Sequence, residues 1–371
     1  MMNMLNISAH NPEDLRREQL LAILQDALEG RRRHVINRLN ALIGTLRVEE
    51  EEADLIAYLF GKAIMSRLDN SRMEVMNLYL RQYDVPQIVL FNLLASKFPV
   101  AMAAGTIANR CLLHAAEGAE TLELLEIGIG TGRQIVHLIQ GLAAMNKPPT
   151  FLTIHAIEPD STSLCIAEAN VREAAKEAGI HLDFHGLARN VEAVEVEFWS
   201  RINETKGRLL VNAAFALHHV HGGAPDAARN HILSLIQSLK PTFVVLCEPD
   251  SDHFVPDVRQ RFAESWRHYS TVFRLIDQCD ISVQEKRSLK IFFSREIEDV
   301  LGMPETDRVE RHERTSYWIR RLQLAGFRPA NATQPKDLPS WPLLEMHSDE
   351  WHIGLSAGNV NIVSIIFATS L

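Results

Sequence analysis

The stretch LLEIGIGTG, residues 124–132, decides the fold, because it ends an apolar run and leads into a segment of helical periodicity. Glycines at alternate positions remove Cβ atoms where the chain turns sharply, and they leave backbone N–H groups open to a ligand at the start of a helix. A strand that passes through such a loop into a helix is typical of a Rossmann-like α/β domain that binds a nucleotide-type cofactor.

Two acids near this loop indicate which cofactor it binds. Glu126 comes just before the glycines, where its charge would repel a pyrophosphate but attract the sulfonium of a cationic cofactor. Glu158 ends the next predicted strand, where it would accept the hydroxyl protons of a ribose. The G-x-G-x-G spacing departs from the G-x-G-x-x-G of dinucleotide sites, which disfavours an NAD-linked oxidoreductase. The pattern predicts S-adenosylmethionine, although each residue alone is also explained as a turn glycine or a solvated strand-end acid.

The residues predicted to bind this cofactor share the carboxyl ends of predicted strands, where ligands lie in open α/β sheets. They are Glu126, Gly128, Gly130, Thr131, Gly132, Glu158, Pro159 and Asn212. All of them follow residue 121, where the pattern of apolar residues changes from continuous helical spacing to short apolar runs.

Beyond residue 121, short apolar runs alternate with helical segments, as expected for parallel strands that are buried on both faces. The runs are 122–127, 151–157, 182–187, 208–213, 243–248, 327–332 and 360–368. This alternation predicts right-handed crossovers and a doubly wound sheet of seven strands.

The rest of the chain has the apolar spacing of helices. Residues 1–118 are predicted to form an all-helical cap, with a first helix starting near Pro12, and residues 119–371 to form the Rossmann-like core. Residues 250–305 are too many for one crossover helix, so they are predicted to be a helical insertion that joins the cap over the site.

Composition narrows the class of partner. The 371-residue chain has a formal net charge of −9, which argues against binding a nucleic-acid backbone. Four separated cysteines form no CxxC pair, and no apolar run is long enough to span a membrane. We expect a soluble cytoplasmic protein. A homodimer is compatible with the sequence, which leaves the oligomeric state open.

Four segments carry a family resemblance: LVNAAFALHHV (210–220), KPTFVVLCEPDSDH (240–253), RFAESWRHYS (261–270), and the block that runs from RHE (311–313) through Trp318 and Leu322 to AGF (325–327). They are similar to blocks of the GRAS family. The glycine loop and strand pattern resemble the class I S-adenosylmethionine-dependent methyltransferases, whose sheet has seven strands with an antiparallel last strand. The GRAS resemblance extends from about residue 20 to the end of the chain.

The resemblance implies one of two functions. Plant members of the family act as transcriptional regulators and generally have a degenerate glycine loop, whereas bacterial members are inferred to methylate small molecules. All three loop glycines are present here. The sequence ends in ATSL, residues 368–371, where plant relatives tend toward serine-alanine-tryptophan. These features favour a bacterial-type methyltransferase of a small molecule. The alternative is a catalytically inactive GRAS-type scaffold for ligand binding or regulation.

Candidate residues for the reacting end follow the fourth and fifth strands. His218 and His219 are predicted to orient an acceptor or take its proton, with Glu248 as a third catalytic residue. Helix capping or packing explains them equally well. A metal at residues 218–221 is disfavoured, because adjacent histidines without a companion ligand seldom converge on one ion. The residues predicted to bind the substrate are His253, Arg261, Glu264 and Tyr269, with surface ion pairing as the alternative for the last three.

Overall fold

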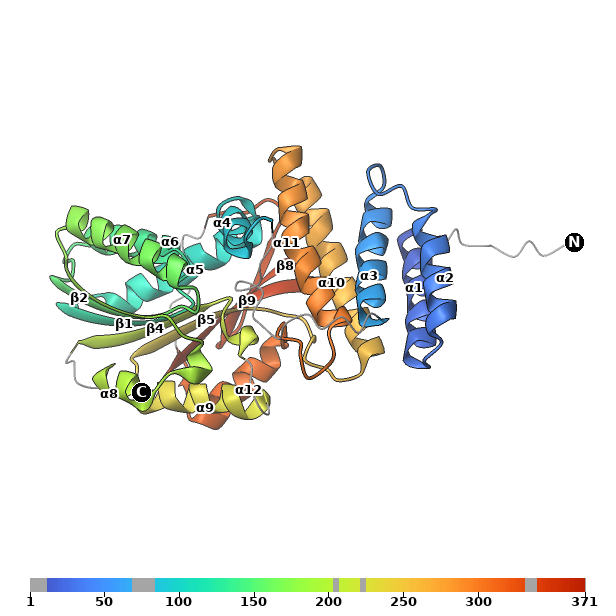
Figure 1. The fold of residues 1–371 in the computed structure, drawn as a ribbon. Coiled ribbons are helices and arrows are strands. Elements are labelled where there is room, and N and C mark those ends of the chain that lie inside the picture. Colours follow the sequence, from blue (N-terminus) through green and yellow to red (C-terminus); the bar gives the residue numbers. More distant parts are fainter. Residues whose placement is uncertain (1–11, 69–83, 203–206, 221–224, 331–338, 371) are drawn as a thin grey trace, which may run out of the picture.

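The computed structural model describes residues 12–68, 84–202, 207–220, 225–330 and 339–370. Within these ranges the chain forms an α/β structure in which helices cover both faces of one mixed sheet (Figure 1). The sheet order is β3-β2-β1-β4-β5-β9-β8-β7, and β6 pairs with β9.

The parallel half of the sheet matches five predicted runs. Its strands are β1 (Thr121–Ile127), β2 (Phe151–Ile157), β3 (His181–Leu187), β4 (Arg208–Ala214) and β5 (Phe243–Pro249). Strand order reverses at β1, because β2 and β4 lie on its two sides. The carboxyl ends of β1, β2 and β4 therefore meet at the switch point where ligands bind in open α/β sheets.

The antiparallel half departs from the sequence prediction. Its strands are β6 (Arg328–Pro329), β7 (Glu345–Ser348), β8 (His352–Ala357) and β9 (Val360–Thr369). The prediction of seven strands is not confirmed, since the sheet formed by the described residues has nine, and the described part of the predicted run 327–332 supplies only the two residues of β6. Part of that run, 331–332, lies outside the described residues.

Helices pack on both faces of the sheet over separate apolar clusters. One face carries α5 (Pro99–Ala116), α6 (Arg133–Ala143) and α7 (Ser161–Ala178) (Figure 1). The other carries α8 (Val196–Ile202), α9 (Pro225–Ser238) and α12 (Thr315–Ala325), with the short 3₁₀ helices η1 (Val191–Ala193) and η2 (Leu217–His219) in the loops.

The remaining helices form a bundle beside the sheet (Figure 1). They are α1 (Pro12–Leu28), α2 (Arg32–Ile43), α3 (Glu52–Leu68), α4 (Gln87–Lys97), α10 (Val258–Gln278) and α11 (Val283–Gly302). The insertion helix α11 packs against α3, so segments far apart in sequence build this bundle together. One continuous apolar cluster runs from Leu20 in α1 to Phe367 in β9. The division of the chain into domains at residues 118 and 119 stays a prediction.

Local signals set the helices of the insertion. Asp257 accepts hydrogen bonds from the backbone N–H groups of Arg259 and Gln260, which starts α10. Ser282 and Glu285 form a reciprocal capping box at the start of α11. Because each cap satisfies N–H groups that have no partner inside the helix, these residues fix where the insertion turns.

Among the described residues, no single helix is long and apolar enough to cross a membrane. Helices α4 and α5 meet that test of length and composition only when taken together, and they are bent by 76° at their junction.

Candidate functional site

The loop after β1 has the tight geometry expected from its glycines. Gly128, Gly130 and Gly132 have φ angles of +80°, +54° and +80°, a region that side chains with a Cβ rarely adopt. A Cβ on Gly128 would lie 2.7 Å from the Cβ of Ala216. Two of the glycines also serve packing, because a Cβ on Gly132 would lie 3.1 Å from Ala167 in α7.

Glu126 faces the inside of the sheet. Its side chain is buried, and both carboxylate oxygens accept hydrogen bonds of 2.9 Å from Nδ2 of Asn212 on the neighbouring strand β4. Burial raises the pKa of Glu126 to about 8, so the neutral acid predominates near pH 7. Neither Glu126 nor Asn212 lines the cavities described below, and their predicted contact with a cofactor stays a prediction.

Glu158 lies where the sequence predicted it, at the end of β2. It accepts hydrogen bonds from the backbone N–H of Gly130, at 2.9 Å, and of Asp160, at 3.0 Å. Burial raises the pKa of this carboxyl group, while the two backbone hydrogen bonds lower it. Glu158 therefore joins the loop after β1 to the end of β2.

A first cavity lies at this switch point, with a volume of about 80 Å³. Four of the predicted cofactor residues line it: Gly128, Gly130, Glu158 and Pro159. Thr131 points elsewhere and donates a hydrogen bond to Oδ1 of Asn92. Sequence reasoning missed the residues of the opposite wall, which include Ile88, Phe91, Asn190, Glu192 and Phe215.

A second cavity of about 50 Å³ lies between the carboxyl end of β5 and the bundle. It is mostly apolar, and His218, His219, His268, Glu296 and His312 supply its polar groups. The two cavities share three wall residues: Phe91, Phe215 and His219. The rings of Phe91 and Phe215 meet edge to face with centroids 6.2 Å apart. Phe215 has a φ of +56°, which is strained for a bulky residue.

The three predicted catalytic residues lie together at the ends of β4 and β5. Nδ1 of His218 lies 2.6 Å from Oε2 of Glu248, and Oε1 of Glu248 accepts a hydrogen bond from the backbone N–H of Leu217. Both side chains are buried. Burial raises the pKa of Glu248 to about 7 and holds the pKa of His218 well below its usual range.

Glu310 lies at the centre of this group, and the sequence analysis did not predict it. Its Oε1 lies 3.0 Å from Nδ1 of His219, and its Oε2 lies 3.5 Å from Nε2 of both His218 and His312. Burial alone would raise the pKa of Glu310 and lower that of His219. Their mutual attraction instead holds the pKa of Glu310 well below its usual range and raises the pKa of His219. We call His218, His219, Glu248, Glu310 and His312 the histidine cluster.

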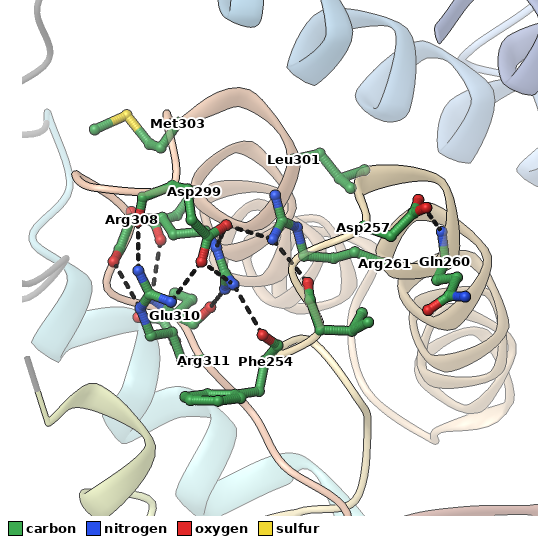
Figure 2. Close-up of polar contacts among 12 residues, drawn as sticks. Phe254, Asp257, Gln260, Arg261, Asp299, Leu301, Met303, Arg308, Glu310 and Arg311 are labelled. Carbon is green, nitrogen blue, oxygen red and sulfur yellow. Dashed lines mark hydrogen bonds and ion pairs between the residues drawn. The ribbon is translucent and has the colours of Figure 1, made fainter. Parts of the chain in front are cut away.

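The four predicted substrate-binding residues line neither cavity. Arg261 is buried and donates hydrogen bonds to Glu305 and to the carbonyl of Val255, beside Arg308 and Arg311 (Figure 2). The Tyr269 hydroxyl donates to Glu296, and His253 bonds to Ser251 at 2.9 Å. Glu264 forms ion pairs with Arg267 and Arg314.

These contacts are internal to the protein. Arg261, Tyr269 and His253 are fully buried. Arg261 reaches the loops that follow β5 and α11, and Tyr269 reaches α11 itself. Glu264 has the ion pairing that the alternative interpretation expected for it. A role in substrate binding stays a prediction for all four.

Two signals in the sequence could have led to the missed residues. The segment 309–314, VERHER, concentrates charged groups and a histidine, and Glu310 and His312 alternate along it. The pair Gly358-Asn359 separates two apolar runs by two residues, which is a hairpin signal and would have revealed β8. His221, part of the stretch considered for a metal, lies outside the described residues.

The fold and the glycine loop define an α/β protein with a mixed sheet. Residues 17–361 match the GRAS domain family, and the chain belongs to this family.

Its relatives include plant proteins. The chain is 30% identical to the GRAS family protein RAD1 of Medicago truncatula over 244 residues, which cover 64% of this chain and 46% of that protein. It is 25% identical to Scarecrow-like protein 28 of Arabidopsis thaliana over 355 residues, which cover 92% of this chain and 54% of that protein. The chain thus spans about half the length of the curated relatives it matches.

A solved structure has the same fold. The crystal structure of SCL7 from Oryza sativa superposes with a TM-score of 0.77 at 21% identity, covering 95% of this chain and 98% of that one. Methyltransferases such as CalH reach a TM-score of only 0.42, which is too weak to transfer an activity.

These findings correct the functional prediction. The predictions of a small-molecule methyltransferase and of an enzyme are wrong, because the relatives are plant GRAS, DELLA and Scarecrow-like proteins. The bacterial assignment is not supported for the same reason. The prediction failed because three glycines in a β1 loop were taken as the mark of an intact donor site. In the structure Gly128 and Gly132 are also required by packing.

Proposed function

We propose that the protein is a catalytically inactive GRAS-type regulatory scaffold that binds a ligand with a nucleoside part in the first cavity. The observation that carries this proposal is the separation of the two cavities. Transfer of a group between two ligands requires their reacting atoms to approach within roughly 3–3.5 Å along a common axis. Here Phe91, Phe215 and His219 stand between the cavity beside the glycine loop and the cavity beside the histidine cluster.

The predicted catalytic side chains of Glu248 and His218 are also engaged in contacts within the protein. Both oxygens of Glu248 have hydrogen-bonding partners, one in the backbone of η2 and one in His218. The remaining nitrogen of His218 faces Glu310. A base that must first break buried contacts is poorly placed to take a proton from an acceptor.

A nucleoside fits the polar features of the first cavity. Glu158 offers a carboxylate at the end of β2, where a ribose diol lies in nucleotide-binding α/β proteins. Apolar side chains such as Ile88, Ile157 and Val191 provide a surface for a flat base. The donor predicted from the sequence, S-adenosylmethionine, therefore enters as a ligand of the scaffold. Glu126 does not support a specific contact with its sulfonium, because this side chain is directed to Asn212.

The size of the cavity sets a condition on binding. About 80 Å³ is below the roughly 300–1,000 Å³ of pockets that enclose drug-sized ligands. A nucleoside must therefore displace side chains of the wall, and Phe91 and Phe215 are the residues whose movement would join the two cavities. Ligand binding would then change the contact between α4 and the sheet, which gives the scaffold a means of regulation.

Protein partners are the second part of the proposal. Plant members of the GRAS family, which this chain resembles, act as transcriptional regulators. A net charge of −9 argues against direct binding to nucleic-acid phosphates. We therefore infer that regulation by this chain proceeds through contacts with other proteins.

Calorimetry tests the ligand. We expect S-adenosylhomocysteine and S-adenosylmethionine to bind the purified chain, and Glu158→Gln to weaken binding by about 1–3 kcal/mol because a charged acceptor of the ribose hydroxyls is lost. Glu192→Gln is the matched control, since it neutralises another carboxylate that lines the same cavity, away from the end of β2. No affinity at about millimolar ligand, or equal losses in the two variants, would contradict the assignment of the cavity.

A separate measurement tests the absence of catalysis. Isotope-labelled S-adenosylmethionine incubated with the protein and a mixture of hydroxyl, amine and thiol acceptors should be recovered unchanged. Steady formation of S-adenosylhomocysteine that disappears in Glu248→Gln would overturn the scaffold proposal, even if the ligand binds as expected.

A further inference from the structure

Three buried side chains of the histidine cluster converge on one point. One potential ligand atom from each of His218, Glu310 and His312 lies within 4.8 Å of the other two. His218 comes from η2 after β4, whereas Glu310 and His312 come from the segment that follows α11. In the described part of the chain, this is the one such group of three or more potential metal ligands.

The spacing of these atoms is that of a coordination sphere. Nitrogen and oxygen ligands lie roughly 2.0–2.2 Å from Zn²⁺, so adjacent ligand atoms of a tetrahedral site are about 3.3–3.5 Å apart. Oε2 of Glu310 lies 3.5 Å from each of the two imidazole nitrogens. Two of the three ligand edges therefore already have the required length. The third edge, between the imidazoles, is at most 4.8 Å.

His218 also has the support that a metal-binding histidine needs. Its Nδ1 lies 2.6 Å from the Glu248 carboxylate. A carboxylate in this position accepts the Nδ1 proton and leaves the lone pair of Nε2 for a metal, an arrangement that recurs around zinc-bound histidines. The backbone N–H of Leu217 in turn holds Glu248 in place.

The ligand atoms of the other two residues make no well-formed hydrogen bond within the described part of the chain. Both ring nitrogens of His312 and Oε2 of Glu310 are buried, and Nε2 of His312 lies 3.5 Å from Oε2 of Glu310. The side chains of His312 and Glu310 are 1% and 0% exposed. Buried polar groups nearly always have a partner, and a missing one indicates an ion or a water.

We propose that His218, Glu310 and His312 bind a single divalent transition metal ion of the Zn²⁺ type. Three protein ligands leave the fourth position open, and His218 and His312 both line the second cavity, so this position faces that cavity. The mixture of two imidazoles and one carboxylate suits Zn²⁺ better than Mg²⁺ or Ca²⁺, which prefer oxygen ligands. The sequence analysis disfavoured a metal at 218–221, because the companion ligands lie some ninety residues further along the chain.

The ion would fasten the insertion to the sheet. Backbone N–H groups of His253 and Phe254 donate to the carbonyl of His312, and Asp250 forms an isolated bridge with Glu313. These contacts already tie the segment after α11 to the loop after β5. A metal shared between His218 and His312 would add a direct tie to the end of β4 and so couple the bundle to the second cavity.

A competing explanation for the histidine cluster involves protonation of a histidine and no metal. His219 is close enough to Glu310, at 3.0 Å, to balance its charge as an imidazolium ion. That explanation accounts for Oε1 of Glu310 but leaves His312 without a role. The two explanations differ in whether the purified protein takes up a metal.

The test is metal binding by the untagged full chain. After removal of metals with a chelator and dialysis, Zn²⁺ is titrated against a chromophoric competitor, and bound zinc is counted by elemental mass spectrometry. We expect about one Zn²⁺ per chain and a zinc-dependent rise in the melting temperature. Glu310→Gln and His312→Gln should abolish this site. Glu248→Gln should weaken affinity about 10–100-fold and keep the stoichiometry, because it changes only the support of His218.

His155→Gln is the matched control. His155 and Glu123 form another buried pair at 2.6 Å, so this variant also loses a buried histidine–glutamate contact. No third potential ligand completes that pair among the described residues. Zinc binding should therefore remain at the level of the unchanged protein.

A spectroscopic measurement covers the case in which the ligand variants fail to fold. X-ray absorption at the zinc edge of the unchanged protein should show two imidazoles and one carboxylate oxygen around the ion. The proposal is overturned if the unchanged protein takes up no zinc, if folded His312→Gln binds zinc equally well, or if the absorption spectrum lacks imidazole. None of these outcomes depends on the nucleoside ligand of the first cavity.

Discussion

The glycine-loop region and the histidine cluster are both built from buried carboxylates at the carboxyl ends of the strands, yet their partners differ. In the glycine-loop region, Glu126 binds an amide of Asn212 and Glu158 binds backbone N–H groups. In the histidine cluster, Glu248 and Glu310 meet imidazoles instead. The first set consists of neutral donors within hydrogen-bonding distance. The second contains charge-balanced contacts and atoms without hydrogen-bonding partners.

The two regions therefore differ in their capacity to bind a further group. The glycine loop is conspicuous in the sequence, and close packing accounts for two of its three glycines, Gly128 and Gly132. The histidine cluster is inconspicuous in the sequence, since its members come from segments about ninety residues apart. It retains unsatisfied groups at the wall of a cavity. Three substitutions test the contrast between the two regions.

Glu126→Gln should have the largest effect, and the effect depends on pH. The pKa of Glu126 is raised by burial from 4.5 to about 8, so the folded state holds a proton that the unfolded state releases. The stability from the neutral acid is complete below about pH 4.5 and is lost as the pH rises towards 8, at about 1.4 kcal/mol per pH unit, or on the order of 5 kcal/mol in total. Glutamine cannot ionise, and it should remove this decline.

Urea unfolding at a series of pH values measures this prediction. Glu285→Gln serves as the control, because the pKa of that partly exposed capping residue is lowered by the hydrogen bonds it accepts from Ser282 rather than raised by burial. If the decline in stability between about pH 4.5 and 8 is the same in Glu126→Gln as in the unchanged protein, Glu126 is not a neutral acid and the contrast between the two regions weakens.

Glu313→Ala should come second, and it acts on the side of the histidine cluster. Glu313 pairs with the buried Arg229 at 3.0 Å and with Arg321 at 2.6 Å. Arg229 also donates a hydrogen bond to the carbonyl of His218. Loss of the carboxylate leaves a buried guanidinium without its charge partner, which should cost about 3–5 kcal/mol of unfolding free energy.

Chemical denaturation followed by tryptophan fluorescence would report the loss, because Trp318 lies against Arg229. Glu264→Ala is the matched control, since its ion pairs with Arg267 and Arg314 are partly exposed and should contribute at most about 1 kcal/mol. Equal costs in the two variants would show that burial does not distinguish the ion pairs of this region.

Gly128→Ala should have the smallest effect of the three and separates packing from ligand binding in the loop. The new Cβ would lie 2.7 Å from Ala216 at a φ of +80°, and strain plus overpacking should cost about 2–4 kcal/mol. Gly130→Ala meets only an ordinary contact of 3.8 Å with Ile88, so backbone strain alone should cost about 1–2 kcal/mol.

Melting temperatures of the two glycine variants, measured side by side, check this order. A Gly130→Ala variant that is folded but no longer binds S-adenosylhomocysteine would tie the middle glycine to the ligand. The reverse order of stabilities would mean that the loop approaches β4 less closely than the structure describes.

Much of the sheet could be predicted from the sequence, because buried parallel strands have apolar runs bounded by turns. The run 151–157 coincides with β2, and the other predicted parallel strands differ from the structure by one residue at an end. The hairpin of β7 and β8 was missed, because β7 is short and exposed and has no apolar pattern. Glu158 was placed correctly at a strand end, since strand register is local.

The histidine cluster could not be predicted in the same way. His218 and Glu248 were expected near each other, because both follow adjacent parallel strands. Glu310 and His312 reach them only through the turn after α11, whose position depends on Asp299. The Asp299 side chain accepts hydrogen bonds from the backbone N–H groups of Val309 and Glu310. No spacing rule relates residues that meet through such an insertion.

Three features could be read from the amino-acid sequence: the alternation of strands and helices, the left-handed glycines of the first loop, and the family. These follow from periodicity, from the conformational freedom of glycine and from contiguous motifs, all of which are properties of neighbouring residues. Only the tertiary structure decided that Glu126 is neutralised by burial, that two cavities replace one, and that a glutamate and a histidine from beyond the insertion meet His218. Burial and long-range contact depend on how distant segments pack, and a linear pattern does not carry that information.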